Sequence, residues 1–264
     1  MKTKSVGFSL FDFDMPRAVM EQLIEQFDTL NEIELTTEAL KELRTFQHQQ
    51  KSKQGVYMLY YNNALVYVGK TNKSLVDRLG KHLFKLSGRQ GIKPKNLAFK
   101  CLYLEENWRT LTHEEALINH YKGAGSCEWN QSGFGNNDPG HDRDTTHWKP
   151  EGFDAKYPIN PDYEIDVEAR QWDLYELLTY IKTSLPYLLR FQREDKAKGK
   201  TAHPDYRSRT VSITSERMSA GKLLRSVTDA LGANWQLTVL PGYMILYKEH
   251  REYKNAIELY RPET

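Results

Sequence analysis

Apolar residues repeat at helical spacing near the start of the chain. In PRAVMEQLIEQF the repeat runs through Val19, Leu23 and Phe27, which places these side chains on one face of a helix. The stretch TTEALKELRTFQ opens on threonines, a residue type that often caps helix N-termini. We therefore expect two helices between residues 15 and 50.

The pattern then changes to short β-type runs. GVYMLYYNNALVYVGK contains two such runs joined by Asn62-Asn63, a pair typical of tight turns. A helix follows at about 75–86, because its leucines form one stripe at helical spacing. LAFKCLYLEE has the composition of a third strand, and THEEALINHYK that of a helix with a capping box. This order predicts an α+β fold.

The second half of the chain is less regular. A stretch rich in Gly, Asn, Asp and Pro predicts a long ordered loop, which compact domains rarely keep without a function. The polar stretch EDKAKGKTAHPDYRSR has the composition of a linker, and the remainder predicts a βαββ unit with Pro241-Gly242 in its last turn. The expected parts are a helical segment at 1–50, a core with its loop at 51–165, a long helix at 166–195 and the βαββ unit at 208–264.

Composition restricts the class of protein. Of the 264 residues, 27% are charged and 39% hydrophobic, which is typical of a soluble globular protein. No apolar run approaches the ~20 residues of a membrane span, and the first residues lack the apolar core of a signal peptide. Two cysteines are too few for a disulfide scaffold. We therefore expect a reduced, cytoplasmic setting.

Charge is distributed unevenly along the chain. The net charge is only +2, yet residues 51–100 hold eleven Lys and Arg against one acid, Asp77. The stretches 1–50 and 101–150 each carry more acids than bases. A local excess of this kind indicates a site for a polyanion, and the alternative is a solvated, lysine-rich face.

Tyrosines are concentrated in the predicted hairpin. Side chains alternate along a strand, so Tyr57 and Tyr61 should share one face while Tyr60 points to the other. Tyr67 lies on the partner strand. A buried phenol needs a hydrogen-bond partner. The cluster therefore either forms an internal network or binds a polar ligand.

These residues resemble the GIY-YIG nuclease superfamily over about residues 54–130. GVY is followed by a YVG whose tyrosine lies ten residues further on, then by an Arg, a Glu and an Asn on later elements. The resemblance implies a three-stranded antiparallel sheet flanked by helices. It also implies the catalytic set Tyr57, Tyr67, Arg78, His82, Glu114 and Asn130.

The resemblance implies a chemical role for each side chain. Tyr57 would be the general base or orient the water, with positive charge from Lys70 and Arg78 lowering its pKa. Arg78 would bind two phosphate oxygens, and its planar guanidinium suits that task better than a lysine. His82, one helical turn further on, would relay a proton or hold the second phenol.

One glutamate should bind the divalent cation. The family has an apolar residue four positions after this glutamate and an aromatic residue seven positions after it. Ile118 and Tyr121 fit Glu114, whereas the corresponding positions for Glu115 do not fit. The expected metal is Mg²⁺, with Mn²⁺ as a substitute, because Mg²⁺ favours one carboxylate with waters and phosphate oxygens.

The stretch WNQSGFGNNDPGHDRDTT is similar to a branch of type II restriction endonucleases that includes cutters of CCGCGG. The resemblance implies a homodimer on a palindromic site in double-stranded DNA. A repair or mobile-element nuclease and a non-catalytic DNA-binding protein remain alternatives. For SGFGNNDPG, a purely structural turn is the alternative to base recognition. The expected DNA contacts are Lys70, Lys73, Lys81, Lys85, Arg89, Asn136, Asn137 and Arg143.

Overall fold

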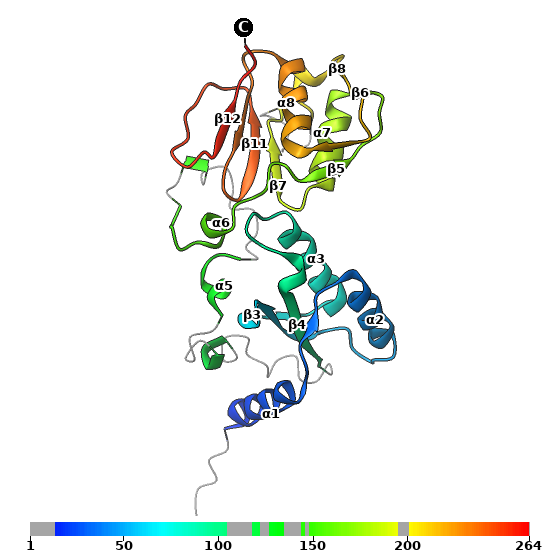
Figure 1. Ribbon diagram of the computed structural model, residues 1–264, viewed down its shortest axis with the longest axis vertical. Coiled ribbons are helices and arrows are strands. Elements are labelled where there is room, and N and C mark those ends of the chain that lie inside the picture. The colour runs from blue at the N-terminus through cyan, green and yellow to red at the C-terminus, as the bar shows by residue number, and fades with distance from the viewer. Residues whose placement is uncertain are drawn as a thin grey trace, which may run out of the picture. The chain divides into compact units, whose positions relative to one another are not determined.

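The computed structural model describes residues 14–104, 118–121, 127–134, 144–145, 148–194 and 201–263 (Figure 1). The chain divides into two compact units. The first comprises Met1–Gly80 and Lys95–Asn130, and the second Lys81–Pro94 and Gln131–Thr264. The expected core at 51–165 is therefore shared between the two units, and one boundary falls within helix α3.

An antiparallel sheet forms the centre of the first unit. The order of its described strands is β1-β4-β2-β3. The hairpin turns at Asn62 and Asn63, whose φ angles of 52° and 61° suit this residue type. The α+β fold with an antiparallel sheet is confirmed, and a short strand that the sequence did not predict, β1, extends it. The bounds are Ile33–Glu34 for β1, Gly55–Tyr61 for β2, Ala64–Thr71 for β3 and Leu97–Tyr103 for β4.

The expected N-terminal helices are present. Helix α1 spans Met15–Thr29, and α2 spans Thr37–His48 with Thr36 as its N-cap. Apolar residues of α1 pack with Val56, Met58 and Tyr60 on one face of β2. Helix α3 begins at Leu75 and ends at Ser87, as the leucine stripe predicts. Residues 118–121 are helical, and the short α5 spans Glu128–Gln131.

The second unit contains a mixed sheet in the order β12-β10-β11-β7, within which β7 and β11 are parallel. Helices α7 and α8 contribute to the large apolar core with Leu237, Val239, Met244 and Leu246 of the sheet. The bounds are Leu174–Ser184 for α7, Leu188–Phe191 for β7, Ala220–Leu231 for α8, Gln236–Val239 for β10, Tyr243–Tyr247 for β11 and Glu258–Tyr260 for β12.

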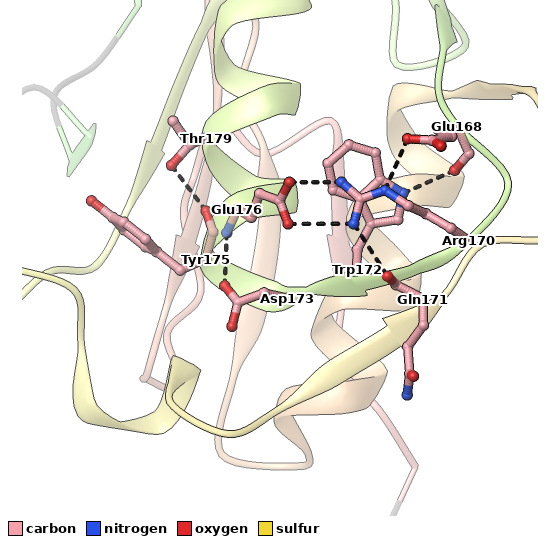
Figure 2. A network of polar contacts seen from close by, with 8 residues as sticks. All are labelled: Glu168, Arg170, Gln171, Trp172, Asp173, Tyr175, Glu176 and Thr179. Atoms are coloured by element: carbon pink, nitrogen blue, oxygen red, sulfur yellow. Dashed lines mark hydrogen bonds and ion pairs between the residues drawn. The ribbon is translucent and has the colours of Figure 1, made fainter.

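The prediction of a long helix at 166–195 is wrong. The chain instead forms β5, β6, the shorter α7 and β7. Asp173 caps α7 by accepting from the Glu176 N–H at 3.0 Å, and the helix ends shortly before Pro186. Figure 2 shows the guanidinium of Arg170 bonded to the carboxylates of Glu168 and Glu176 at the start of α7. Strand pairing holds the extended segments at 164–166 and 171–173, where the sequence resembled a helix.

The βαββ unit expected at 208–264 is correct in part. Helix α8 and the β10–β11 hairpin are present, with Pro241-Gly242 between the two strands. The preceding strands β8 and β9 pair with β6 and β5 rather than entering the mixed sheet, which includes β7 and β12. The bounds are Glu164–Asp166 for β5, Gln171–Asp173 for β6, Thr210–Ser212 for β8 and Arg217–Ser219 for β9.

Shorter elements connect these parts. They are α6 at Phe153–Lys156 and the 3-10 helices η1 at Pro94–Asn96 and η4 at Pro204–Tyr206. Tyr206 is buried in the core of the second unit, so this part of the expected linker belongs to the fold. None of the helices in the described ranges is long and apolar enough to cross a membrane.

Candidate active site

Two strands and one helix bring Tyr57, Tyr67 and Arg78 together in the first unit. Tyr57 pairs with Gly69 in the β2–β3 register, so the two tyrosines lie on the same face of neighbouring strands. Their ring centroids are 6.0 Å apart, and both residues are buried. Arg78, in the first turn of α3, donates its Nε–H to the Tyr57 hydroxyl at 3.0 Å. These three predicted site residues therefore meet.

The glycine of YVG makes this arrangement possible. A Cβ atom at Gly69 would lie 2.4 Å from both Cζ and Oη of Tyr57 and 2.7 Å from Cε1 of Tyr67. Carbon atoms in contact are normally about 3.5–4.0 Å apart. The Tyr57 ring thus packs directly against the backbone of Gly69. The sequence analysis did not assign Gly69 to the site. The YVG motif itself contained the signal.

Burial dominates the electrostatics of Tyr57. It raises the pKa of the Tyr57 hydroxyl well above its usual range, and the neighbouring Tyr67 raises it further. The hydrogen bond and charge of Arg78 act in the opposite direction but do not outweigh burial. Tyr57 is therefore a neutral phenol near pH 7. Forming a phenolate there requires positive charge beyond that of Arg78.

Arg78 remains a cation. Desolvation acts to lower its pKa, but the hydrogen bond to Tyr57 and the fields of Tyr57 and Tyr67 together raise it. The guanidinium has five N–H donors and uses its Nε–H on Tyr57. A positive, half-buried group beside two phenols is suited to an anionic ligand such as a phosphate.

Asn130 binds the edge of the same sheet. Its Nδ2 donates to the Val68 carbonyl and its Oδ1 accepts from the Val68 N–H, both at 2.8 Å. The Cys127 N–H also donates to the Leu65 carbonyl at 3.1 Å. The segment before Asn130 thus follows the outer edge of β3. Because Val68 lies between Tyr67 and Gly69, this contact positions the strand that carries them.

The predicted DNA-binding residues differ in their surroundings. Lys70 pairs with Val56 and so belongs to the sheet face opposite Tyr57, while Lys73 is exposed in the turn after β3. Lys81 and Lys85 are exposed on α3. Lys70 therefore does not share the face on which Arg78 meets the phenol.

Arg89 is engaged within the second unit. Its Nη1 lies 2.7 Å from Asp154 Oδ1 and donates to the Tyr157 carbonyl at 3.1 Å. The guanidinium also lies over the Phe153 ring at 5.3 Å, and the side chain is only 11% exposed. This geometry favours a structural role over DNA binding.

His82 lies one turn after Arg78 on α3, in the part of the helix that belongs to the second unit. The residue is buried, and its ring centroid is 5.0 Å from that of Phe134. The described contact is one of packing. Glu114, Asn136, Asn137 and Arg143 lie outside the described residues.

The ligand predicted for a divalent cation, Glu114, is not among the residues that the structure describes. The phenols and the guanidinium that meet on the sheet include no carboxylate that could bind a divalent cation. Within the described ranges, no group of three His, Cys, Asp or Glu is placed to hold a metal ion. Ile118 and Tyr121 pack against the core of the first unit, whereas Asn119 is exposed. The choice of Glu114 over Glu115 rests on the residue types at these positions and stays a prediction.

Comparison with known proteins agrees with this geometry. The family model of the GIY-YIG catalytic domain matches residues 53–125, a range that contains β2, β3, α3 and β4. No curated protein matches the chain. The antiparallel sheet and its helices are consistent with such a core, and the domain supports a nuclease. Residues 53–125 are thus similar to the GIY-YIG catalytic domain.

Proposed function

We propose that the protein is a divalent-metal-dependent endonuclease that cleaves double-stranded DNA at a specific site, as type II restriction enzymes do. The contact between Arg78 Nε–H and the Tyr57 hydroxyl, beside Tyr67, carries the proposal. It places a permanent cation next to a phenol within the matched catalytic domain. Hydrolysis of a phosphodiester needs a positioned water, a proton acceptor and a cation for the developing negative charge.

Each residue has a role in this mechanism. Other N–H groups of the guanidinium donate to non-bridging oxygens of the phosphate, a charge-assisted contact that strengthens as negative charge develops. Further positive charge would lower the pKa of the phenol, so that Tyr57 releases its own proton to solvent; the phenolate then orients the attacking water and accepts its proton. Asn130 holds β3 through Val68, so that Tyr67 keeps its place.

Glu114 is the proposed ligand for Mg²⁺ or Mn²⁺. The bound cation would supply a Lewis acid for the phosphate and the additional positive charge that the Tyr57 phenol requires. The remaining steps depend on the protein's own residues: Arg78 binds the phosphate and Tyr57 orients the water.

We assign recognition of the DNA to the basic residues 51–100 and to the loop at 123–165. Lys73, Lys81 and Lys85 are exposed and can contact phosphates. Asn136, Asn137 and Arg143 have the side chains that read adenine and guanine edges. A homodimer on a palindromic site would present two catalytic sites to the two strands.

Plasmid cleavage tests the proposal. Plasmid DNA incubated with the protein and Mg²⁺ should give discrete fragments, and EDTA should prevent cleavage. Nicking or smearing would instead indicate a repair-type nuclease, and intact DNA would refute the nuclease. Arg78→Lys should lose most of the activity, while Arg44→Lys, an exposed arginine on α2, serves as the matched control.

The dimer needs a separate measurement. Light scattering of the protein on its cognate duplex should give two chains per site. A stable complex of one chain per duplex that cuts both strands at once would refute the dimer.

A further inference from the structure

A buried glutamine that precedes the catalytic domain binds the start of α3. Gln47 lies in the last turn of α2 and is only 3% exposed. Its Oε1 accepts from the Ser74 hydroxyl at 3.2 Å, the Val76 N–H at 3.5 Å and the Tyr103 hydroxyl at 3.4 Å. One amide oxygen thus joins α2 to the first turn of α3 and to β4.

The first turn of a helix needs acceptors from elsewhere, because its N–H groups have none within the helix. In α3, the Leu75 N–H donates to the Lys53 carbonyl at 2.9 Å. The Asp77 N–H donates to the Ser74 hydroxyl oxygen at 3.1 Å. Gln47 is the acceptor for the N–H between them and also binds the hydroxyl that caps Asp77. Two separate segments, together with Ser74 just before the helix, therefore hold the first turn of α3 in place.

Arg78 follows directly in the same turn. Its backbone N–H donates to the Ser74 carbonyl at 3.0 Å, and its Nε–H donates to the Tyr57 hydroxyl at 3.0 Å. A hydrogen bond is lost at a separation of about 3.6 Å. A shift of this turn by about 0.6 Å away from Tyr57 would therefore be enough to break the contact between the arginine and the phenol.

We infer that Gln47 is a positioning residue for Arg78, and that α2 is a working part of the catalytic domain although it precedes residues 53–125. The inference rests on the proposed phosphodiesterase function. A neutral amide suits this place because it accepts hydrogen bonds without burying a charge. The ion pair of Arg44 with Asp77 joins the same helices, but both side chains are about half exposed, so it contributes little.

Replacement of Gln47 by methionine tests this role, because it removes the acceptor at similar size. The single-turnover rate of DNA cleavage should fall about 10- to 100-fold with little change in DNA affinity, as expected for a misplaced catalytic group. Gln49→Met is the matched control, since Gln49 is exposed at the end of the same helix. Gln47→Glu keeps an acceptor oxygen but buries a charge, so it should restore only part of the rate.

A double-mutant cycle separates positioning from a general loss of stability. If Gln47 acts through Arg78, Gln47→Met should slow an Arg78→Lys enzyme by no more than about twofold further. An undiminished second loss would refute the inference. Thermal unfolding of each variant fixes an assay temperature at which all are folded. If Gln47→Met does not fold, Gln47→Asn takes its place in the experiment. The asparagine side chain is shorter by one methylene group, so its amide oxygen is withdrawn from the donors of α3.

A readout independent of cleavage distinguishes this inference from the proposed function. The ¹⁵N–¹H signal of the Arg78 Nε–H, assigned by its loss in Arg78→Lys, reports the hydrogen bond to Tyr57. Gln47→Met should shift this signal and speed its exchange with water, and Gln49→Met should leave it unchanged. An unchanged signal in Gln47→Met would overturn the positioning role. A wild-type protein that cuts no DNA would instead overturn the proposed function.

Discussion

An alanine at Gly69 should displace the tyrosine at the centre of the site. The added Cβ would lie 2.4 Å from Cζ and Oη of Tyr57, about 1 Å inside a normal contact distance. The buried ring has to move by about this amount or the two strands have to separate. Either response lengthens the 3.0 Å hydrogen bond from Arg78 beyond the range of a hydrogen bond.

The magnitude follows from this displacement. A catalytic group misplaced by about 1 Å lowers the rate by about 10²-fold, and overpacking a buried site lowers the free energy of unfolding by about 1–3 kcal/mol. Gly69→Ala should therefore lose about two orders of magnitude in single-turnover cleavage while remaining folded. Denaturant unfolding measures the second effect on the same preparation.

Gly80→Ala is the matched control. Gly80 lies within α3, and a Cβ there would meet Leu40 Cδ1 at 3.8 Å, an ordinary contact distance. Because alanine favours a helix over glycine, this variant should gain about 0.5–1 kcal/mol in stability and keep its activity. Wild-type cleavage by Gly69→Ala would refute the conclusion that Tyr57 must lie where this structure places it.

Other predictions concern single groups and pH. Tyr57→Phe should lower the rate about 10²–10⁴-fold with little change in stability, and an unchanged rate would place the base elsewhere. Glu114→Ala should abolish cleavage but not DNA binding, whereas Glu115→Ala should still cut; the reverse would change the assigned ligand. Asp144→Ala should lower the free energy of unfolding by about 3–5 kcal/mol in denaturant titrations, because it breaks a buried ion pair with Arg190 at 2.6 Å; a loss under about 1 kcal/mol would contradict this. Burial raises the pKa of Cys101 and Cys127 and of several tyrosines above their unfolded values near 8.5 and 10, so stability should begin to fall above about pH 8.5 and fall further above about pH 10; circular dichroism that stays native well above that pH would disprove it.

Short-range patterns in the sequence determined the elements that carry the site. Apolar spacing and end caps are local properties, so α1, α2 and α3 begin and end close to the predicted positions. Side chains alternate along β2, so the order of the residues alone places Tyr57 and Tyr60 on opposite faces. The order of motif residues indicated that Tyr57, Tyr67 and Arg78 belong to one site.

Tertiary structure decided the contacts that hold these residues. Gln47 meets Tyr103 across 56 positions, and Asn130 meets Val68 across 62, through hydrogen bonds that no local pattern encodes. The expected helix at 166–195 did not form because Asp173 caps a shorter helix and the strands before it, β5 and β6, pair with the distant β9 and β8. Burial of Tyr57 likewise raises its pKa, a property of the packed site and not of the motif. Local spacing determines helices and strands, whereas pairing of distant segments determines how close their side chains lie and how far each is removed from water.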